Sequence, residues 1–408
     1  MSQLTQPAQK DVTVSPALAT RTPLVVLQVI PSLESGGAER ATIEIARAVV
    51  AEGGRALVAT SGGRLVAALG AVGGEVIRMR AKSKNPLVIL WNAERLARIA
   101  REEGVQVIHA RSRAPAWSGL IAAGLADVPF VTTFHGLYKG TSALKRWYNG
   151  VMARGATVIA NSEFTAAHIR RVYPWAAGRI VTIPRGVDVD IFAPEAVEPA
   201  RAEALRRAWG VLPGVPLVLL PGRLTGWKGQ DILLEGLARL DVPVPPVGVF
   251  VGDTQSVRFE EQLKAKAEKL GLTDRVRFAG YCADMPAAYR AADVVVSAST
   301  EPEAFGRVAV EAQALGAVVV ATDLGATAET VLEGEAGTGF RIPAEDPEAL
   351  ALALAKALAL SPAERGALAR RAIAHVRSRY TLNSMAAATL NVYRSERGVK
   401  KRGGRHGA

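Results

Sequence analysis

Apolar residues along the chain form short continuous runs that alternate with longer segments in which apolar positions recur every three or four residues. The first run covers 24–30, a glycine turn follows at 35–37, and helical spacing begins at 38 and extends to 50. A continuous apolar run of this length is typical of a strand buried on both faces. Strand, glycine turn and helix together form the opening unit of a parallel α/β domain.

This alternation occurs in two series. In the first, strands are predicted at 56–60, 75–79, 105–109, 130–133, 156–160 and 180–183, with helices at 87–103 and 117–125. In the second, strands are predicted at 217–220, 247–251, 276–279, 294–297 and 318–322, with helices at 259–270, 285–291 and 308–315 and a long helical region over 347–393. Proline and acidic residues gather between the series, so we expect two parallel α/β domains that meet near residue 190. If the two sheets face each other, the carboxyl ends of their strands border a cleft for ligands.

Composition narrows the class of protein. Lysine and arginine number 50 against 38 aspartate and glutamate residues, and the net charge of +12 favours nucleic acid, acidic lipid or a phosphorylated metabolite as partner. The single cysteine, Cys282, excludes a disulfide framework and a cysteine-ligated zinc site, and five histidines leave little material for a metal centre. Apolar runs fall short of the ~20 residues of a membrane span, and residues 1–22 lack the apolar core of a signal peptide. We expect a cytoplasmic protein with a flexible tail over 1–22.

A glycine-rich loop over 221–229 stands between a predicted strand and a predicted helix. Glycines let the backbone approach a ligand, and the start of a helix offers free N–H groups to an anion. Arg223 and Lys228 add two positive charges, so the loop is interpreted as a diphosphate clamp, or else as a turn with two solvated basic residues. The loop lacks the Gly-Lys-Ser/Thr ending of a Walker A motif.

A second loop, 301–307, runs into a helix that carries Glu311. Glu303 and Glu311 have seven residues between them, and the two carboxylates could each bind the hydroxyls of one sugar of a nucleotide sugar. The alternative is a capping acid and a salt-bridge partner. A third glycine loop, at Gly36 and Gly37, lacks the Gly-x-Gly-x-x-Gly pattern, so it either makes room for an acceptor or phosphate or is only a tight turn.

Together these motifs resemble the retaining glycosyltransferases of family 4, over roughly residues 24–395. The residues that carry the resemblance are Gly222-Arg223, Lys228-Gly229, Glu303-Ala304-Phe305-Gly306, Glu311, Gly36-Gly37-Ala38-Glu39, Asn161-Ser162-Glu163, and Pro184-Arg185-Gly186-Val187-Asp188 with Phe192. Arg185 stands where the family usually has asparagine. The resemblance implies the GT-B fold, in which two Rossmann-like domains face a central cleft. It divides the chain into an acceptor-side domain (23–190), a nucleotide-sugar domain (191–380), a helix that packs back on the first domain (381–396) and a basic tail (397–408).

The family also implies a role for individual residues. Arg223 and Lys228 would bind the diphosphate of a UDP-, GDP- or ADP-sugar, Glu303 the sugar hydroxyls and Glu311 the ribose. The remaining donor-site residues are the glycines 36, 37, 222 and 252 and the backbone N–H groups of Ala304, Phe305 and Gly306. His135 would lie near the reacting end of the sugar, and the turn 280–283 near the base. The positive groups would stabilise the leaving diphosphate, which could take the acceptor's proton, so the expected reaction proceeds with retention and without a metal, another cofactor or a protein nucleophile.

The acceptor is indicated by basic residues interleaved with aromatic ones. Lys139, Lys145, Arg146 and Arg154 surround Trp147 and Tyr148, and Arg111 and Arg113 precede Trp117. This pattern suits an anionic membrane or a phosphorylated glycolipid, and the alternative is a solvated helix with Trp147 in the core. The stretches 134–140 and 111–117 resemble lipopolysaccharide-core transferases. We therefore expect a hexosyltransferase of lipopolysaccharide or envelope polysaccharide synthesis at the cytoplasmic face of the inner membrane.

Three alternatives remain open at this point. A nucleotide-sugar epimerase of the same fold would not need a basic acceptor face. A non-catalytic sugar-nucleotide-binding protein would not need the full set of donor residues. The basic run 400–405 could bind nucleic acid non-specifically, but no helix-turn-helix, zinc finger or stacking platform supports specific binding.

Overall fold

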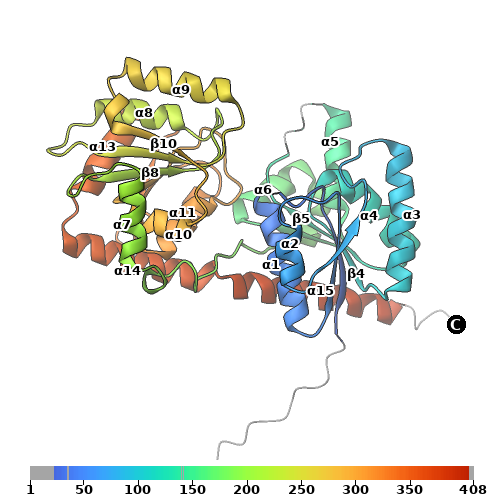
Figure 1. Cartoon of the computed structure of the whole chain (residues 1–408). Coiled ribbons are helices and arrows are strands. Elements are labelled where there is room, and N and C mark those ends of the chain that lie inside the picture. The colour runs from blue at the N-terminus through green and yellow to red at the C-terminus, as the bar shows by residue number, and fades with distance from the viewer. Residues whose placement is uncertain (1–22, 35, 139, 141, 404–408) are drawn as a thin grey trace, which may run out of the picture.

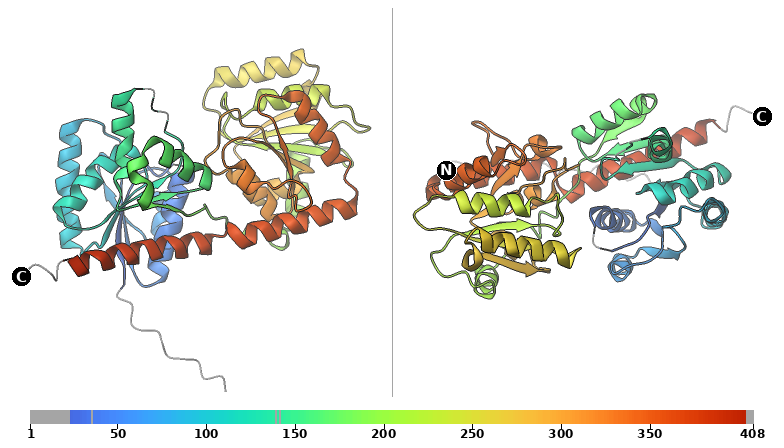
Figure 2. Two further views of the ribbon diagram at one scale, coloured as in Figure 1. Left: turned by 180° about the vertical axis from the view of Figure 1, so that it is seen from behind. Right: turned by 90° about the horizontal axis from the view of Figure 1, so that it is seen from above.

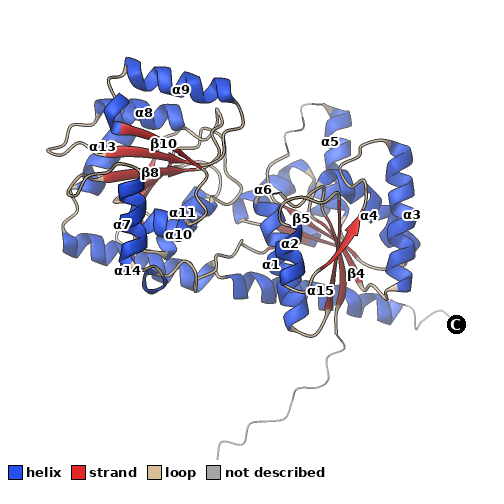
Figure 3. Cartoon of the chain, in the orientation of Figure 1, coloured by secondary structure: helices blue, strands red, loops and turns tan. Residues whose placement is uncertain are grey.

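The computed structural model describes residues 23–403 except for residues 35, 139 and 141, and it forms two α/β domains (Figure 1). The tail expected over 1–22 and the last part of the basic tail, 404–408, lie outside the described residues. Each domain has a central sheet with helices on both faces (Figure 3). The predicted pair of parallel sheets is confirmed.

The first domain contains a seven-stranded parallel sheet in the order β3-β2-β1-β4-β5-β6-β7. Its strands are β1 (Val25–Val29), β2 (Arg55–Thr60), β3 (Glu75–Arg78), β4 (Val107–Ala110), β5 (Phe130–Phe134), β6 (Thr157–Ala160) and β7 (Ile180–Thr182). Its helices are α1 (Gly37–Ala51), α2 (Val66–Ala71), α3 (Pro86–Glu102), α4 (Arg113–Leu125), α5 (Ala143–Asn149) and α6 (Glu163–Val172). The core on one face joins α3, α4 and α6, and that on the other joins α1 and α2. The strand order reverses between β1 and β4, and ligands of such sheets bind at that point.

The second domain contains a six-stranded parallel sheet in the order β10-β9-β8-β11-β12-β13. Its strands are β8 (Leu217–Pro221), β9 (Val247–Val251), β10 (Val276–Gly280), β11 (Val294–Ser297), β12 (Val318–Thr322) and β13 (Phe340–Ile342). Its helices are α7 (Pro199–Ala208), α8 (Gln230–Arg239), α9 (Val257–Lys269), α10 (Met285–Ala291), α11 (Arg307–Ala314), α12 (Thr327–Thr330), α13 (Pro347–Leu358) and α14 (Pro362–Arg379). The strand order of this sheet reverses between β8 and β11, just as the strand order of the first sheet reverses between β1 and β4.

The helical region predicted over 347–393 is divided into three helices. Ser361 is the N-cap of α14, shortly after the end of α13. Its hydroxyl accepts from the backbone N–H of Glu364, and the carboxylate of Glu364 accepts from the N–H of Ser361. This capping box starts α14 at Pro362. The last helix is α15 (Leu382–Gly403). The helical region predicted over 347–393 is present, and the structure adds the caps that divide it, which helical spacing alone does not locate.

The chain crosses between the domains twice, and the two crossings lie side by side. The N–H of Val187 donates to the carbonyl of Tyr380 (2.8 Å), and the N–H of Leu382 donates to the carbonyl of Val187 (3.0 Å). A side chain at Gly186 would lie 2.6 Å from the Cα of Leu382, so only glycine permits this approach. After the second crossing, α15 runs along the first domain (Figure 2), and its Tyr393 is fully buried there.

Candidate active site

A cleft of about 270 Å³ lies between the domains, at the carboxyl ends of β1 and β8. The first domain contributes Gly36, Gly37 and Arg40. The residues from the second domain include Gly222, Arg223, Gly252, Asp253, Tyr281, Cys282, Tyr289, Arg307 and Glu311. The structure therefore brings the predicted glycine loops of both domains to one cavity, and it places Tyr281 and Cys282 of the turn predicted to contact the base at the same place.

Two glycine loops of the second domain pack backbone against backbone below the cleft. Gly252 has φ of +153°, and a Cβ there would overlap the carbonyl oxygen of Gly222. Gly229 has φ of +75°, and a Cβ there would overlap the carbonyl oxygen of Ala298. These positions require glycine because both the backbone conformation and the space exclude a side chain. The packing brings Arg223 to the cleft as an exposed side chain.

Lys228 and Glu303 form an ion pair in the loops beside the cleft. The Nζ of Lys228 lies 2.7 Å from Oε1 of Glu303, and the hydroxyl of Ser299 donates to the same oxygen at 2.5 Å. The side chains of Lys228 and Glu303 are 16% and 15% exposed. The carbonyl of Glu303 also accepts from the N–H of Ala326 (2.9 Å). A cation and a carboxylate that were expected to bind different parts of a donor are thus held next to each other in a partly desolvated position.

Glu311 lies in the second turn of α11 and lines the cleft, although it is mostly buried. One carboxylate oxygen accepts from the hydroxyl of Tyr289 (2.9 Å), and the other accepts from Nε of Arg307 (2.9 Å). Burial raises the pKa of Tyr289 well above its usual value, so this hydroxyl keeps its proton and donates. The contacts of Tyr289 and Arg307 with Glu311 could not be predicted from the sequence, because nothing in the spacing of these residues indicates them.

The loop that precedes α11 is tied to the first domain. Gly306 is the N-cap of α11 with φ of +79°, and Phe305 is buried beside it. The hydroxyl of Ser162 donates to the carbonyl of Ala304 (2.6 Å), across the domain boundary. In the other direction, the carboxylate of Glu329 accepts from two backbone N–H groups at the start of α6 (2.9 and 2.7 Å). The motif that contains Ser162 therefore fixes the position of the loop against the first domain.

His135 follows β5, and both of its ring nitrogens are buried without a hydrogen-bond partner among the described residues. Burial, together with the positive charges of Arg185 and Arg111, holds the pKa of His135 well below its usual value. The imidazole is therefore neutral at pH 7, with one nitrogen available as donor and the other as acceptor. Such a ring can hydrogen-bond to an uncharged hydroxyl.

The basic and aromatic residues predicted to form an acceptor surface do not all lie on a surface. Arg111 is buried, and its Nε and Nη2 donate to Oε1 of Gln28 (2.9 and 2.6 Å), so the expectation that Arg111 belongs to this surface was wrong. Trp147 is 55% exposed although it packs on Trp117, with ring centroids 4.7 Å apart, so the alternative with Trp147 in the core was also wrong. Lys139 lies outside the described residues.

Of the other basic residues predicted to form the acceptor surface, some are exposed to solvent and others contact neighbouring side chains. Lys145 and Arg146 are exposed on α5, beside Trp147. Arg113 places its guanidinium 4.5 Å from the ring centroid of Tyr138 and donates to Oδ1 of Asn149 (3.0 Å). Arg154 is exposed and lies 5.8 Å from the ring of Trp175.

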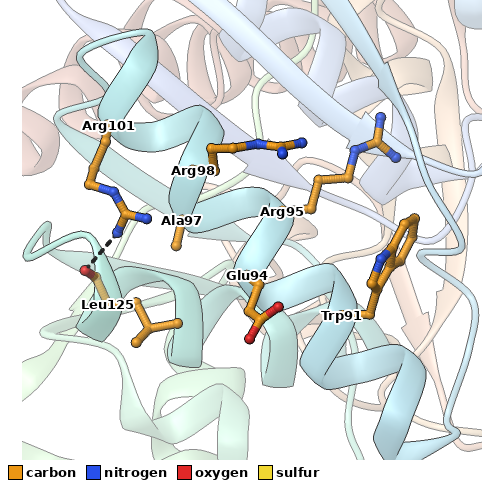
Figure 4. Close-up of a pocket in the computed structure, with 7 residues that line it drawn as sticks. All are labelled: Trp91, Glu94, Arg95, Ala97, Arg98, Arg101 and Leu125. Atoms are coloured by element: carbon orange, nitrogen blue, oxygen red, sulfur yellow. Dashed lines mark hydrogen bonds between the residues drawn. The ribbon is translucent and has the colours of Figure 1, made fainter.

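Helix α3 lies on the side of the first domain that faces away from the second (Figure 1). A second hollow, of about 490 Å³, is lined mainly by residues of this helix. Figure 4 shows its side chains, among them Trp91, Arg95 and Arg98 of α3, with Leu125 from the end of α4. Trp91 and Leu125 are both more than half exposed. This group was not predicted from the sequence, although its basic and apolar residues recur at helical spacing.

Comparisons with known proteins agree with the fold and the cleft. Residues 35–191 match the family described as Glycosyltransferase Family 4, and residues 202–375 match the family described as Glycosyl transferases group 1. A D-inositol 3-phosphate glycosyltransferase of Xylanimonas cellulosilytica is 33% identical over 72% of this chain and 73% of its own length. The lipopolysaccharide core biosynthesis mannosyltransferase LpcC of Rhizobium leguminosarum bv. viciae is 32% identical over 71% of this chain and 78% of its own length.

Comparisons with solved structures also find glycosyltransferases of similar fold. A glycosyltransferase of Rickettsia africae is 35% identical, with a TM-score of 0.85 over 92% of this chain and 99% of that chain. The Anabaena protein HepE in complex with UDP and glucose is 26% identical, with a TM-score of 0.81 over 91% of this chain and 100% of that chain. The chain therefore belongs to the group 1, family 4 glycosyltransferases and has the GT-B fold. It is a glycosyltransferase.

Proposed function

We propose that this glycosyltransferase transfers a hexose, with retention and without a metal, from a nucleotide diphosphate sugar to a glycolipid or saccharide of the bacterial envelope. The observation that carries the proposal is the cleft, in which Arg223 and Glu311 line one cavity and the Lys228–Glu303 pair lies in the loops beside it. This arrangement supplies positive charge for a diphosphate and carboxylates for sugar hydroxyls. The Anabaena protein HepE, which is similar over nearly the whole chain, binds UDP and glucose.

The proposed reaction uses the groups of the cleft as follows. The bond between the anomeric carbon and the phosphate oxygen breaks, and the acceptor oxygen bonds to the same face of that carbon. The leaving phosphate takes the acceptor's proton, so no side chain has to act as nucleophile. Arg223, Lys228 and the start of α11 stabilise the negative charge that develops on the diphosphate. The neutral His135 would hydrogen-bond to a hydroxyl of the sugar, and no further cofactor is needed.

The acceptor side of the proposal rests on the outer surface of the first domain. Trp147 is exposed on α5, which also carries the exposed Lys145, and the exposed Trp91 on α3 has the guanidinium of Arg95 5.8 Å from its ring centroid. Among the similar proteins are lipopolysaccharide core mannosyltransferases, whose names place them in envelope synthesis. None of the described helices is long and apolar enough to cross a bilayer. We propose that this surface binds an anionic membrane peripherally, at the cytoplasmic face of the inner membrane.

The membrane part is tested by co-sedimentation with lipid vesicles. Vesicles that contain phosphatidylglycerol should bind the protein, high salt should release it, and the Trp147→Ser variant should bind less. Val257→Ser is the control because Val257 is also an exposed apolar residue but lies on α9 of the other domain. Equal binding to phosphatidylcholine vesicles, or none to either, contradicts a role for anionic lipid.

The donor part is tested by a thermal-shift series with UDP, GDP, ADP and their sugars, first with EDTA and then with magnesium. A ligand that binds only the folded state raises the unfolding temperature by mass action. We expect one base series to raise it without metal, and the products of a reaction with that donor to carry the anomeric configuration of the donor. If no nucleotide shifts a folded sample, the donor proposal is wrong, and a non-catalytic member of the family becomes the better description.

A further inference from the structure

The carboxylate of Glu329 belongs to the second domain but pairs with the start of a helix in the first. Glu329 lies on α12, and its carboxylate oxygens accept from the backbone N–H groups of Glu163 (2.9 Å) and Phe164 (2.7 Å), the first two residues of α6. The first N–H groups of a helix have no partner within the helix, and the positive end of the helix dipole favours a negative charge there. Glu329 therefore caps a helix of the first domain from across the domain boundary.

The start of α6 also holds the segment 303–306 of the second domain, which leads into α11 and is called the donor loop here. The hydroxyl of Ser162 accepts from the N–H of Thr165 (3.0 Å) and donates its proton to the carbonyl of Ala304 (2.6 Å). The hydroxyl of Thr165 donates to the same carbonyl at 3.3 Å. One helix start in the first domain thus contacts two segments of the second domain, the donor loop and Glu329.

Within the second domain, these two segments are joined backbone to backbone. The N–H of Ala326 donates to the carbonyl of Glu303 (2.9 Å), and a Cβ at Gly325, where φ is +70°, would overlap that carbonyl oxygen. The carbonyl of Glu329 accepts from the hydroxyl of Tyr380 (2.6 Å), which directly precedes the second crossing between the domains. Because Gly325 and Ala326 lie just before α12, a displacement of the donor loop is passed on to Glu329.

We propose that Glu329 is a positioning residue for the transfer reaction, which fixes the donor loop to the first domain. The proposal rests on the proposed transferase function, in which the donor binds the second domain and the acceptor the first. Helix α6 lies on the side of the first domain that faces the second (Figure 1). The two charge-assisted hydrogen bonds form only while the domains are in contact, so they favour this arrangement over an open one. By linkage, a ligand that orders the donor loop strengthens the cap on α6, and loss of the cap loosens the loop.

The first test is hydrogen–deuterium exchange of the ligand-free full chain, with each partner of the contact changed in turn. Glu329→Gln keeps the size of the side chain, but its amide nitrogen cannot accept and its charge is lost. Glu163→Pro removes one N–H from the first-domain side, at the first helical position, where proline is tolerated. Glu333→Gln is the matched control, because the carboxylate of Glu333 pairs with Arg341 of its own domain at 2.7 Å.

We expect the amide of Phe164 to exchange about tenfold faster in Glu329→Gln, because the charge-assisted hydrogen bond is replaced by a neutral one or lost. Exchange over 304–306 should rise in both Glu329→Gln and Glu163→Pro and stay at the wild-type rate in Glu333→Gln. Faster exchange at α6 alone would overturn the proposal, because Glu329 would then only cap a helix. Unchanged exchange in both segments would overturn it as well.

The second test repeats the exchange with UDP, GDP and ADP in turn. In the wild type, the nucleotide that raises the unfolding temperature should slow exchange at the start of α6. In Glu329→Gln the same nucleotide should still bind but without this effect. The same response in both proteins, whether slower exchange or none, contradicts the coupling through Glu329. If no nucleotide binds the wild type, the donor proposal fails, and the ligand-free exchange still decides the role of Glu329.

Steady-state transfer separates a positioning role from a role in stability alone. Glu329→Gln and Glu163→Pro should each lower kcat per folded molecule by about tenfold, the factor expected for the loss of one charge-assisted hydrogen bond. The KM for the donor should change by less than about threefold, since neither residue lines the cleft. If both variants lower only the unfolding temperature and keep the wild-type kcat in the folded fraction, the positioning role is wrong.

Discussion

Replacing Lys228 with methionine tests whether the ion pair with Glu303 belongs to the reaction. The variant keeps most of the side chain's volume and removes its charge. It also leaves the side chain of Glu303 about 85% buried, with the hydroxyl of Ser299 as a remaining hydrogen-bond donor to its carboxylate. The transition state would then lose a desolvated positive charge beside the leaving diphosphate. We expect kcat to fall by about 100- to 1,000-fold, the range measured when one electrostatic contact to a developing anion is removed.

The cost to stability follows from the burial of the pair. Exposed pairs contribute about 0–1 kcal/mol, and breaking a fully buried pair costs about 3–5 kcal/mol. The Lys228–Glu303 pair has a separation of 2.7 Å and is mostly but not fully buried. We therefore expect Lys228→Met to lower the free energy of unfolding by about 2 kcal/mol, which corresponds to a fall of about 4–8 °C in the unfolding temperature of a domain of this size.

The control is Lys266→Met in the same domain. Nζ of Lys266 also lies 2.7 Å from a carboxylate oxygen, that of Glu235, but the pair joins α9 to α8 outside the cleft. This substitution should cost about 1 kcal/mol and leave the rate unchanged. The assay is steady-state transfer with the donor found by thermal shift, beside thermal unfolding of both variants. A Lys228→Met rate within about threefold of wild type, in a folded sample, would refute the role in the reaction.

Three further predictions concern the fold and its pH dependence. Gly252→Ala should cost about 3 kcal/mol in denaturant unfolding, because its φ of +153° and the adjoining backbone both exclude a side chain, whereas Gly178→Ala, with open space around it, should change little. Tyr393→Phe should cost about 1–3 kcal/mol in the same assay, since its hydroxyl lies 2.6 Å from the buried Nδ1 of His109, which would lose its partner. Burial lowers the pKa of His135, so the unfolded chain takes up a proton below about pH 6.5 that the folded chain does not, and stability should fall as pH drops from 7.5 to 5.5. His135→Gln should remove about 1 kcal/mol of that fall, and an unchanged pH dependence would contradict the neutral, buried ring.

The sequence allowed much of the fold to be predicted, for reasons that are local. Short continuous apolar runs bounded by turn residues are typical of buried strands, and the central strands were located to within one or two residues. Glycines with positive φ, such as Gly229 and Gly306, stand where strands turn into helices, and these marked the loops around the cleft. The break between α13 and α14 was missed because it depends on the capping box of Ser361, and the surrounding spacing continues across it.

The site was predicted less completely because contacts between distant residues leave no periodic pattern. Arg111 and Arg113 are two residues apart, yet Arg111 turns inward to Gln28 and Arg113 lies over Tyr138. The sequence marked Arg185 only as a departure from a motif. Its burial against Gly37 depends on how the crossing segment passes below α1, which no local rule predicts.

By itself, the sequence determined two parallel α/β domains, the glycine loops at their strand ends and the residue types available for an anionic sugar donor. These features follow from hydrophobic periodicity and backbone conformation, which act over a few residues. Only the tertiary structure decided that the loops meet in one cleft and that Lys228 pairs with Glu303. It also decided that a buried Arg185 faces the start of α1. Such pairings depend on the relative position of two domains and on the loss of water around charges, so they arise when the chain packs and cannot be read from spacing.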